Sequence, residues 1–458
     1  MPTHFFQGAT LRELVAEQGG RFLDKTFLYF EEEEISYGKL DEIANKIGNA
    51  LLGYGLAKGD RVALHLPNCT DYVLALFGCF KAGLVAVPIN TMLKAPEVEH
   101  QLRNSRARAI VTTPELLAAT EENRGACWEL SRVIVVGGGK AGGAAIAFDA
   151  LYRASSEPPP VEVAPEDLAT IIYTSGTTGK PKGAELTHAN YVYDARACAQ
   201  AAEIRAEERM GCILPLFHVN AQVVTMLTPM IAGGSMALFE GFHPGTFLSD
   251  LERFQVTCFS AVPTVYAILN ALPDAEEYDL SHLRFCICGA APMPVEVFEE
   301  FERKYKAYIL EGYGLSEGTC ASTLNPLRGT RKIGSIGLAL PGQEVRIVDE
   351  DGKEVDAGTV GEIVVRGPNV MRGYADDPEA TAEALRDGWL RTGDLGRRDA
   401  EGYFYIEGRK KEMIICGGEN IYPREIEGVL HEHPGVLECA VVGVPHAVYG
   451  EEPAAVLV

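Results

Sequence analysis

The chain contains 458 residues, too many for one hydrophobic core, so we expect two or more domains. Its content of 47% hydrophobic and 23% charged residues is typical of a folded globular protein. Its formal net charge of −23 argues against nucleic acid or an anionic lipid surface as a partner, and an anionic ligand would need a locally positive site.

Neither the N-terminus nor the cysteines indicate export or a membrane. Residues 1–20 lack the basic start and long apolar run of a signal peptide, and the most apolar later stretch, 223–239, is broken by Pro229, Gly233 and Gly234. The 11 cysteines include no CxxC pair. We therefore expect no integral membrane segment, and a cytoplasmic protein with reduced thiols.

Helical and strand patterns alternate along the first 300 residues. Amphipathic helices are predicted over residues 36–55 and 70–83, and apolar strands over 60–66 and 84–89. Residues 153–166, RASSEPPPVEVAPE, form a proline-rich connector. After it we expect strands at 167–173, 235–239, 257–263 and 283–289, and helices that begin near Thr187, His243, Pro263 and Pro294. This alternation predicts parallel sheets with helices on both faces.

The pattern changes near Gly342. Residues 343–367 alternate between apolar and polar side chains and contain the turn dipeptide Asp351-Gly352, which predicts an antiparallel meander. Upstream, Cys286 and Cys288 lie two apart on a predicted strand, so both should face the same side. We interpret this pair as core packing rather than a metal site.

Residues 137–142, GGGKAG, follow an apolar run and match the dinucleotide fingerprint GxGxxG. A dinucleotide site also needs a helix after the loop and an acidic residue at the end of a second strand. We expect no second strand before the prolines, so a surface turn is the favoured interpretation. A nicotinamide oxidoreductase is the remote alternative.

Residues 173–183, YTSGTTGKPKG, are a stronger signal. Glycines let backbone N–H groups turn toward an anion, and neighbouring hydroxyls and one lysine add donors and charge; these residues are Thr174, Ser175, Gly176, Thr177, Thr178, Gly179 and Lys182. The loop follows a predicted strand and precedes a predicted helix. It is not a Walker loop, because Pro181 follows Lys180 where that motif carries Ser or Thr. We interpret it as a phosphate-binding loop.

This loop resembles the phosphate-loop signature of the adenylate-forming superfamily, which includes acyl-CoA synthetases. Further blocks resemble that superfamily in the same order: PLFHVNA (215–221), CGAAPMP (288–294), EGYGLSEGT (311–319), GWLRTGDLG (388–396) and GRKKEMIICGGENIYPREIE (408–427). The likeness covers essentially the whole chain, and several ordered blocks are more specific than any single motif.

The resemblance implies an α/β fold with a large N-terminal domain, residues 1–409, of two helix-covered, mainly parallel sheets and a distorted antiparallel barrel. Residues 410–458 would begin a small α+β domain. The implied reaction joins a carboxylate to the α-phosphate of ATP and then passes the acyl group to the thiol of coenzyme A. Because an anion attacks a polyanion, this chemistry needs positive charge, Mg²⁺ and alignment.

For the nucleotide, the resemblance implies that Tyr313 stacks on adenine beside Glu311 and Gly312. Ser316 would donate to the α-phosphate, although many relatives carry threonine there, and Glu317 would hold Mg²⁺. Asp394 would bind the ribose hydroxyls. Arg409 would lie near the ribose and phosphates. The expected catalytic residues are Lys182, Ser316, Glu317, His218 and Arg409.

For the acyl group, the resemblance implies that His218 gates a pocket lined on one side by Val219, Asn220 and Val224. The opposite wall would be formed by Gly289, Ala290 and Ala291. Asn220 is the one polar residue among these pocket residues. It could bind a substrate hydroxyl or carbonyl, or cap a turn. Gly417 and Gly418 would adjoin the coenzyme A tunnel. Lys411 would be the hinge of the C-terminal domain.

The sequence ends at GEEPAAVLV, before the late lysine block of the superfamily. We expect a truncated C-terminal domain, in which AAVLV would be a strand at an edge, and weak adenylation by this chain. Apolar fatty or medium-chain acids, or aryl acids, are the expected substrates. One alternative is an adenylating enzyme whose acyl acceptor is a carrier protein or an amine. Another is a non-catalytic nucleotide-binding protein. The acid and the oligomeric state stay open.

Overall fold

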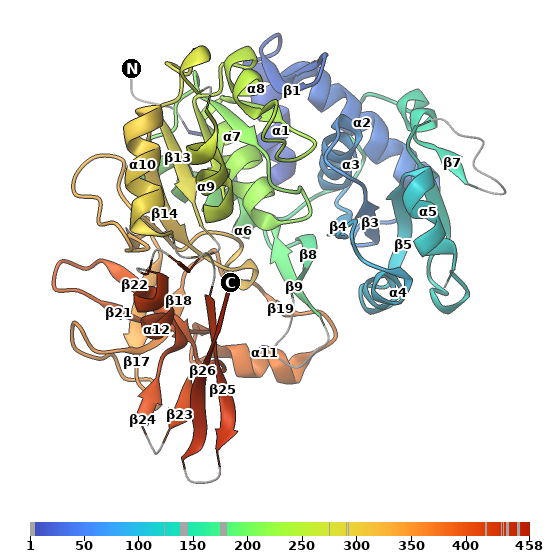
Figure 1. Cartoon of the computed structure of the whole chain (residues 1–458). Coiled ribbons are helices and arrows are strands. Elements are labelled where there is room, and N and C mark those ends of the chain that lie inside the picture. Colours follow the sequence, from blue (N-terminus) through green and yellow to red (C-terminus); the bar gives the residue numbers. More distant parts are fainter. Residues whose placement is uncertain are drawn as a thin grey trace.

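The computed structural model describes residues 5–122, 124–137, 145–174, 181–273, 275–289, 291, 293–416, 419–431, 433, 435–436, 439–446 and 449–458. Four sheets organise these residues, and helices flank the two largest (Figure 1). The predicted α/β class with mainly parallel sheets is confirmed. No helix in these residues is long and apolar enough to cross a membrane.

The eight-stranded sheet has the order β19-β9-β8-β4-β3-β5-β6-β7. It is parallel from β8 to β7, whereas β9 and β19 join it antiparallel at one edge. Its strands are β3 (Arg61–His65), β4 (Val85–Pro88), β5 (Ala107–Thr112), β6 (Arg132–Val135), β7 (Ile146–Ala147), β8 (Leu168–Thr174), β9 (Lys182–Thr187) and β19 (Gly373–Tyr374).

The nine-stranded sheet has the order β16-β15-β14-β13-β12-β10-β11-β1-β2 and is parallel from β14 to β1. Its strands are β1 (Thr26–Phe30), β2 (Glu33–Ser36), β10 (Arg209–Cys212), β11 (Ser235–Leu238), β12 (Cys258–Ala261), β13 (Phe285–Cys288), β14 (Tyr308–Tyr313), β15 (Thr323–Leu324) and β16 (Leu338–Ala339). Cys286 and Cys288 on β13 are buried in the core, as predicted.

Helices pack on and between these two sheets (Figure 1). Side-chain caps set several helix starts; Thr187 and Asn190 form a reciprocal capping box at the start of α6. The α-helices are α1 (Leu11–Arg21), α2 (Tyr37–Gly53), α3 (Thr70–Lys81), α4 (Ala95–Asn104), α5 (Pro114–Glu121), α6 (His188–Ala201), α7 (Thr228–Ala232), α8 (Phe247–Arg253), α9 (Pro263–Ala271) and α10 (Val295–Tyr305). Short 3₁₀ helices lie at Arg124–Ala126, Phe148–Arg153, Ala275–Glu277 and Ser316–Gly318, and a π-helix at Ala221–Leu227.

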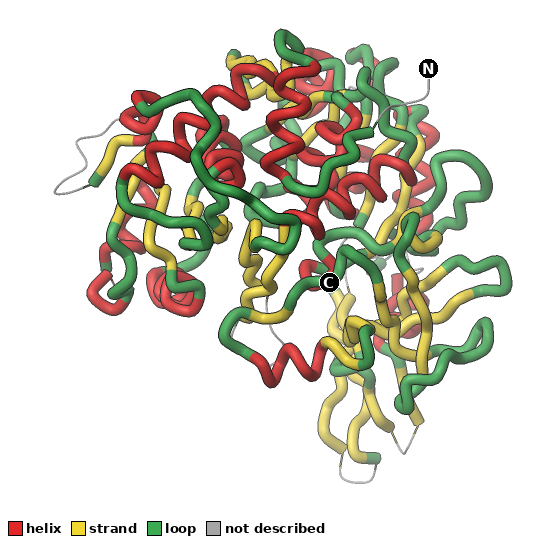
Figure 2. The backbone as a smooth tube through the Cα atoms, turned by 180° about the vertical axis from the view of Figure 1, so that it is seen from behind, coloured by secondary structure: helices red, strands yellow, loops and turns green. Residues whose placement is uncertain are grey.

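The part after residue 342 is mainly strands (Figure 2). The predicted meander is a curled antiparallel sheet, with its first turn at Asp351-Gly352, followed by a four-stranded sheet in the order β24-β23-β26-β25. The elements are β17 (Glu344–Val348), β18 (Gly361–Arg366), α11 (Pro378–Ala384), β20 (Leu385–Arg386), β21 (Trp389–Arg398), β22 (Phe404–Arg409), β23 (Ile414–Cys416), β24 (Glu419–Ile421), α12 (Pro423–His431), β25 (Cys439–His446) and β26 (Gly450–Leu457).

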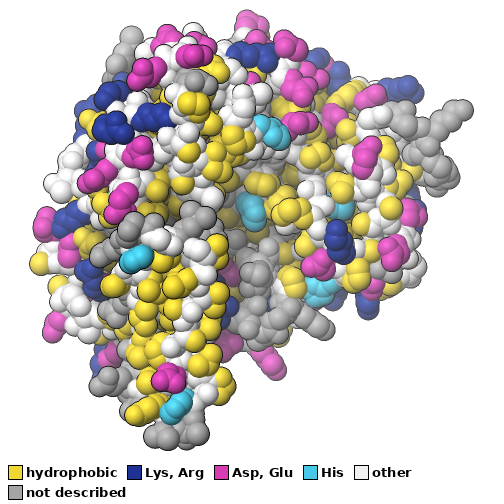
Figure 3. Space-filling view, viewed as in Figure 1, with side chains coloured by type: hydrophobic (Ala, Val, Ile, Leu, Met, Phe, Trp, Pro, Cys, Tyr) yellow, Lys and Arg dark blue, Asp and Glu magenta, His cyan; other side chains and the backbone are white. Residues whose placement is uncertain are grey.

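Strand β26 has neighbours on both sides only at its first residue, among the described part of the chain. It pairs with β25 along its whole length and meets β23 at Cys416 and Gly450. Within the described chain, residues 454–457 of AAVLV therefore pair on one side only, with β25, which agrees with the expected strand at an edge. Apolar side chains of these two strands, among them Val442 and Val456, are exposed and form a hydrophobic surface (Figure 3).

Three local predictions are corrected. The loop after β8 leads first into an unpredicted strand, β9, which pairs antiparallel with β8; helix α6 then begins at His188, in agreement with the predicted start near Thr187. A short strand, β7, follows residues 138–144 and pairs with β6 before the prolines; the GGGKAG loop itself lies almost entirely outside the described residues. Helix α8 begins at Phe247 rather than near His243, because residues 244–246 form a turn.

Candidate active site

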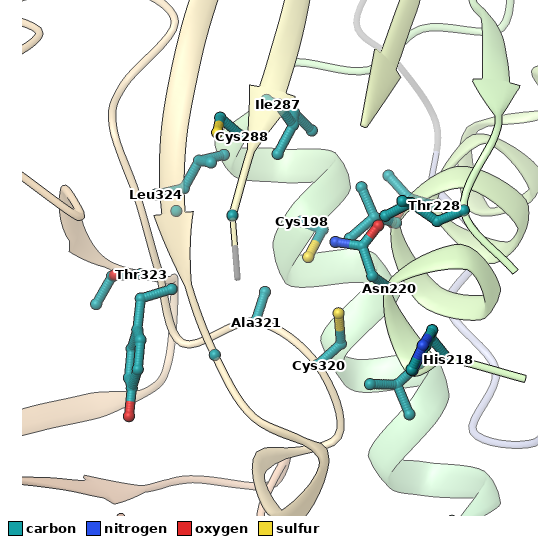
Figure 4. Close-up of a pocket in the computed structure, with 18 of the residues that line it drawn as sticks. Cys198, His218, Asn220, Thr228, Ile287, Cys288, Cys320, Ala321, Thr323 and Leu324 are labelled. Atoms are coloured by element: carbon teal, nitrogen blue, oxygen red, sulfur yellow. The ribbon is translucent and has the colours of Figure 1, made fainter. Parts of the chain in front are cut away.

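An apolar cavity of about 350 Å³ lies between α6, the π-helix and the ends of β12, β13 and β14. Its lining includes four residues predicted for the acyl group, His218, Val219, Asn220 and Val224, and Gly289 on the opposite side. Most other lining side chains are apolar or thiols, among them Ile204, Leu214 and Val262. Figure 4 shows five more of them, Cys198, Ile287, Cys288, Cys320 and Leu324.

The cavity carries little charge. His218 is exposed at the wall of the cavity. The protein around it still removes part of its water, which lowers its pKa because desolvation disfavours the charged imidazolium. Burial raises the pKa of the Cys198 and Cys320 thiols, so both stay protonated. The cavity therefore suits the uncharged part of a ligand.

A second cavity of about 550 Å³ adjoins the first. Both are lined by Cys288 and by residues 312–315 at the end of β14. The second is also lined by residues of β21 and β22, by α12 and by β25, and its polar groups include Glu311, Asp394, Arg409, Glu412 and Glu427. It suits a larger, more polar ligand group.

Asp394 joins two elements of this second cavity. Its Oδ2 accepts a hydrogen bond of 2.6 Å from the Tyr313 hydroxyl of β14, and its Oδ1 lies 3.1 Å from the Arg409 Nε of β22. Burial raises the pKa values of Asp394 and Tyr313. Each carboxylate oxygen has a further lone pair, so Asp394 can still accept hydrogen bonds from a ligand.

Glu317 is the centre of a third group, which joins the 3₁₀ helix at Ser316–Gly318 to one edge of the eight-stranded sheet. Its Oε1 accepts hydrogen bonds from the Thr174 hydroxyl (3.2 Å) and the Tyr374 hydroxyl (2.8 Å). The Lys182 Nζ lies 5.3 Å from the centre of the Tyr374 ring. Thr174 ends β8 and Lys182 begins β9, so these groups surround the base of the loop 175–180.

The loop that carries Glu317 contains a strained turn. Thr319 has φ 67° and ψ −59°, and the N–H of Cys320 donates to the carbonyl of Gly318 (2.8 Å), which together define a classic γ-turn. Such a conformation is costly for a β-branched residue and persists only where the surroundings enforce it. The buried Asn369 donates to the Gly318 carbonyl (3.0 Å), and the Thr319 hydroxyl donates to the Asn369 carbonyl (2.5 Å).

The structure brings together most of the predicted site residues that it describes. Ser316 lines the first cavity, Glu311 the second, and Gly312 both. Ala291 lines the second cavity rather than the first. Lys411 lies in an exposed turn between β22 and β23. The predicted residues outside the described range are Ser175, Gly176, Thr177, Thr178, Gly179, Ala290, Gly417 and Gly418.

Sequence reasoning missed several residues of the site. Tyr374 contacts Glu317 from 57 positions along the chain, and the Gly-Tyr pair that forms β19 carries no motif that signals a site. Thr228 and the cysteines of the first cavity were likewise indistinguishable from core residues. The clue to Thr228 was Pro229, which interrupts the helical pattern and accompanies the π-helix.

The chemistry of these side chains fits Mg²⁺ bound with a nucleotide. Carboxylate and hydroxyl oxygens are hard donors, and Mg²⁺ is typically held by one or two carboxylates together with substrate phosphates and water. The described residues contain no cluster of three or more potential metal-ligating side chains, so the protein alone offers no closed metal cage there. A single carboxylate, Glu317, which shares the neighbour Tyr374 with Lys182, matches an ion shared with phosphates.

The sequence profile of the AMP-binding enzyme family matches residues 15–375, and that of the AMP-binding enzyme C-terminal domain matches residues 425–458. The chain is 39% identical over 425 residues to feruloyl-CoA synthase of an Amycolatopsis species, covering 93% of this chain and 83% of that protein. It is 36% identical over 471 residues to a long-chain-fatty-acid–CoA ligase of Bacillus subtilis (strain 168), covering 96% of this chain and 84% of that protein.

Solved structures agree in fold. The chain matches an anthranilate CoA ligase in complex with anthranoyl-AMP with a TM-score of 0.92 and 31% identity, over 99% of this chain and 87% of that one. It matches ATP-bound MatB from Rhodopseudomonas palustris with a TM-score of 0.88 and 33% identity, over 97% of this chain and 88% of that one. Enzymes of this type use ATP, Mg²⁺ and coenzyme A. With a profile match over most of its length, the chain belongs to the AMP-binding enzyme family, as an acid–thiol ligase of the acyl-CoA synthetase type.

Proposed function

We propose that the chain is a carboxylate–CoA ligase that activates an apolar acid, of the fatty, medium-chain or aryl type, at the expense of ATP. The observation that carries this proposal is the pair of adjoining cavities. One is apolar, the other is lined by polar and charged groups, and residues 312–315 belong to both. A mixed anhydride of a carboxylate and AMP has the same division into an apolar and a polar half.

In the first step, a carboxylate oxygen of the acid forms a bond to the α-phosphorus of ATP. The bond between that phosphorus and the bridging oxygen breaks, and pyrophosphate leaves with the electron pair. The protein's task is to neutralise charge and to align the reactants. Lys182, Thr174 and the loop 175–180 would bind phosphate oxygens, Ser316 would donate to the α-phosphate, and Glu317 would hold Mg²⁺.

For the nucleoside, Tyr313 would stack on adenine beside Glu311 and Gly312. Asp394 would accept hydrogen bonds from the ribose hydroxyls, and Arg409 would supply positive charge near the ribose and phosphates. The ion pair between Asp394 and Arg409 supports this assignment, since it holds both side chains at the second cavity.

For the acid, His218 would lie between the nucleotide and a pocket lined by Val219, Val224 and Gly289, with Ala290 and Ala291 nearby. The apolar lining of the first cavity supports an acid whose carboxylate is attached to a hydrophobic body. The lowered pKa of His218 makes it neutral near pH 7, so it would not hold a second negative charge in the pocket.

In the second step, the thiolate of coenzyme A would attack the acyl carbonyl, and AMP would leave with the electron pair. Gly417 and Gly418 would adjoin the pantetheine, and Lys411 would act as a hinge between residues 1–409 and 410–458. The exposure of Lys411 in a turn between two sheets supports the hinge, because such a residue can change its backbone angles without disturbing a core.

The proposal is tested by incubating the protein with Mg²⁺, ATP and a panel of fatty and aryl acids, and measuring AMP and thioester. Coenzyme A, a phosphopantetheinylated carrier protein and an amine are offered separately. AMP and acyl-CoA should form with at least one acid. Glu317→Gln and Lys182→Ala should lower the rate by about 100-fold or more, since each removes charge that acts on the reacting phosphates.

Glu296→Gln, an exposed glutamate on α10, is the matched control and should keep the wild-type rate. Two outcomes would contradict the proposal: AMP formation that does not change in the Glu317 and Lys182 variants, or turnover only with a carrier protein or an amine as acceptor.

A further inference from the structure

The wall of the first cavity contains an uncommon element, the π-helix over Ala221–Leu227. Pro229 has no N–H to donate, and the N–H of Thr228 donates to the carbonyl of Val223, five residues earlier. Residues four apart on this segment share one face. Asn220, Val224 and Thr228 all line the cavity.

Asn220 brings an amide into this apolar space (Figure 4). Its Oδ1 atom is buried and has no hydrogen-bond partner among the described residues. Buried polar atoms in folded proteins are nearly always paired, so an unpaired one at the wall of a ligand cavity needs a physical reason. The usual reasons are an ordered water molecule or a ligand group.

The neighbours of Asn220 indicate which ligand group fits. Figure 4 shows Asn220 beside Thr228 and on the side of the cavity that carries Cys198. The Thr228 hydroxyl donates to the carbonyl of Ala195 (3.4 Å), so its lone pairs remain able to accept. No charged side chain lines this cavity among the described residues, since its one ionisable base, His218, is neutral near pH 7. An uncharged polar group therefore fits here, whereas a second carboxylate does not.

We propose that the acid bound by this protein carries a hydroxyl group on its hydrophobic body, and that Asn220 recognises this hydroxyl through hydrogen bonds. This inference rests on the proposed function and adds the substrate class to it. A hydroxyl fits because it has one proton to donate and lone pairs that accept. It can donate to the unpaired Oδ1 of Asn220, or it can accept from the NH₂ group of the amide and donate to Thr228 instead. An acid without this group leaves the buried amide unpaired and loses affinity in the transition state.

The hydroxyl can belong to an aromatic or an aliphatic acid, and matched pairs separate the two sources. Each pair is compared by kcat/KM for acyl-CoA formation: 4-hydroxycinnamate with cinnamate, and 10-hydroxydecanoate with decanoate. In at least one pair the hydroxylated acid should be preferred by about tenfold or more. The pair with the larger ratio identifies the type of acid.

The residue is tested with Asn220→Leu, which has a similar size and no polar atoms. The preference for the hydroxylated acid should fall to about onefold or reverse, mainly because the plain acid improves. Asn45→Leu is the matched control, since Asn45 likewise has a buried Oδ1 atom with no partner among the described residues, but it lies on α2, away from the cavity. It should keep the wild-type preference.

Equal use of hydroxylated and plain acids by the wild-type protein would overturn the inference. A water molecule would then be sufficient to pair with the Asn220 amide. A preference that survives in Asn220→Leu would also overturn it. If that variant does not fold, Asn220→Ser tests the same point, since its shorter side chain should reduce the preference. If no acid yields AMP at all, the proposed function fails instead, and that result is distinct from equal rates within a pair.

Discussion

At the residue scale, the electrostatics of the site depend on a few side chains that share partners. Glu317 receives hydrogen bonds from Thr174 and Tyr374, and the ring of Tyr374 lies beside Lys182. Tyr374 thus contacts the expected ligand of Mg²⁺ with its hydroxyl and the lysine of the phosphate loop with its ring. Two oppositely charged groups are oriented by one side chain.

Tyr374→Phe should raise the Mg²⁺ concentration needed for half-maximal AMP formation by about tenfold, because a hydrogen bond to a charged group is lost while the ring beside Lys182 remains. The measurement is a Mg²⁺ titration of AMP formation, repeated as calorimetric titration of ATP with and without Mg²⁺. Tyr193→Phe, which loses a hydroxyl that donates to Pro341 outside the site, should behave like the wild type. An unchanged Mg²⁺ requirement in Tyr374→Phe would contradict the assignment.

Asp194 is a residue whose protonation state affects the stability of the fold, although no sequence motif marks it. It is fully buried on α6, and its carboxylate accepts hydrogen bonds from the N–H of Ala321 (2.9 Å) and from Gln343 (3.1 Å). Burial raises its pKa to about 8. The folded protein therefore binds a proton that the unfolded chain releases near pH 4, so this carboxyl costs stability progressively as pH rises from about 4 to 8.

Asp194→Asn should remove that cost. Relative to the wild type, the variant should gain up to about 1.4 kcal/mol of unfolding free energy for each pH unit between pH 5 and 8. Thermal melting of both proteins at pH 5, 6, 7 and 8 measures the trend, with Asp351→Asn, an exposed turn residue, as control. Parallel pH profiles for wild type and Asp194→Asn would show that the buried carboxyl does not titrate in this range.

At the element scale, the segments that carry the site are held by backbone contacts between distant parts of the chain. The N–H of Met371 donates to the carbonyl of Glu317 (2.8 Å), and Asn190, in the first turn of α6, donates to the carbonyls of Pro368 and Val370. Residues 368–371 thus connect α6 to the loop with the strained γ-turn.

Asn369→Ala should release that turn. It removes the hydrogen bond to the Gly318 carbonyl, so the unfolding free energy should fall by about 1–3 kcal/mol, and Mg²⁺-dependent ATP binding should weaken because Glu317 is no longer held in place. Asn49→Ala is the control, since it too loses side-chain hydrogen bonds to backbone carbonyls, those of Ser155 and Glu157, but lies outside the site. Melting temperature and ATP affinity are measured for both variants. Equal effects on ATP affinity would refute a local role for Asn369.

At the scale of the whole molecule, the site lies where three sheets meet. The eight-stranded sheet contributes Thr174, Lys182 and Tyr374, the nine-stranded sheet contributes Tyr313, and the curled sheet contributes Asp394 and Arg409. A ligand in the second cavity would touch at least two of these sheets. Binding should therefore stabilise the arrangement of the sheets and not only one loop.

ATP with Mg²⁺ should raise the melting temperature, with a stabilisation of about 2.7 kcal/mol at a hundredfold excess over the dissociation constant. Asp394→Asn should lose most of this shift, because Asp394 holds both Tyr313 and Arg409 at the cavity. Asp376→Asn, which loses only a surface ion pair with Arg106, is the control and should keep the shift. A full ATP shift in Asp394→Asn would contradict the assignment of this residue to the nucleotide.

Much of the fold follows from local patterns. Apolar runs of four to six residues became β3, β4, β11, β12 and β13, and Pro263 begins α9, because strand and helix periods are visible within a short window. Strand β9 was missed because KGAELT contains too few apolar residues to be distinguished from a loop. The π-helix was missed because its sequence has an ordinary helical composition, and only the position of Pro229 hints at the altered hydrogen bonding.

The amino-acid sequence by itself determined the class of the protein, since the glycines, hydroxyls and lysine of residues 173–183 and the later blocks are contiguous motifs whose chemistry does not depend on distant neighbours. It also determined where several of the strands and helices lie. Only the tertiary structure decided that Tyr374 meets Glu317, that Asp194 is buried without a counter-ion among the described residues, and that the amide of Asn220 lies unpaired in an apolar cavity. The reason is physical: contact, burial and pairing are properties of residues brought together by packing from far apart in the chain, and a local pattern does not encode them.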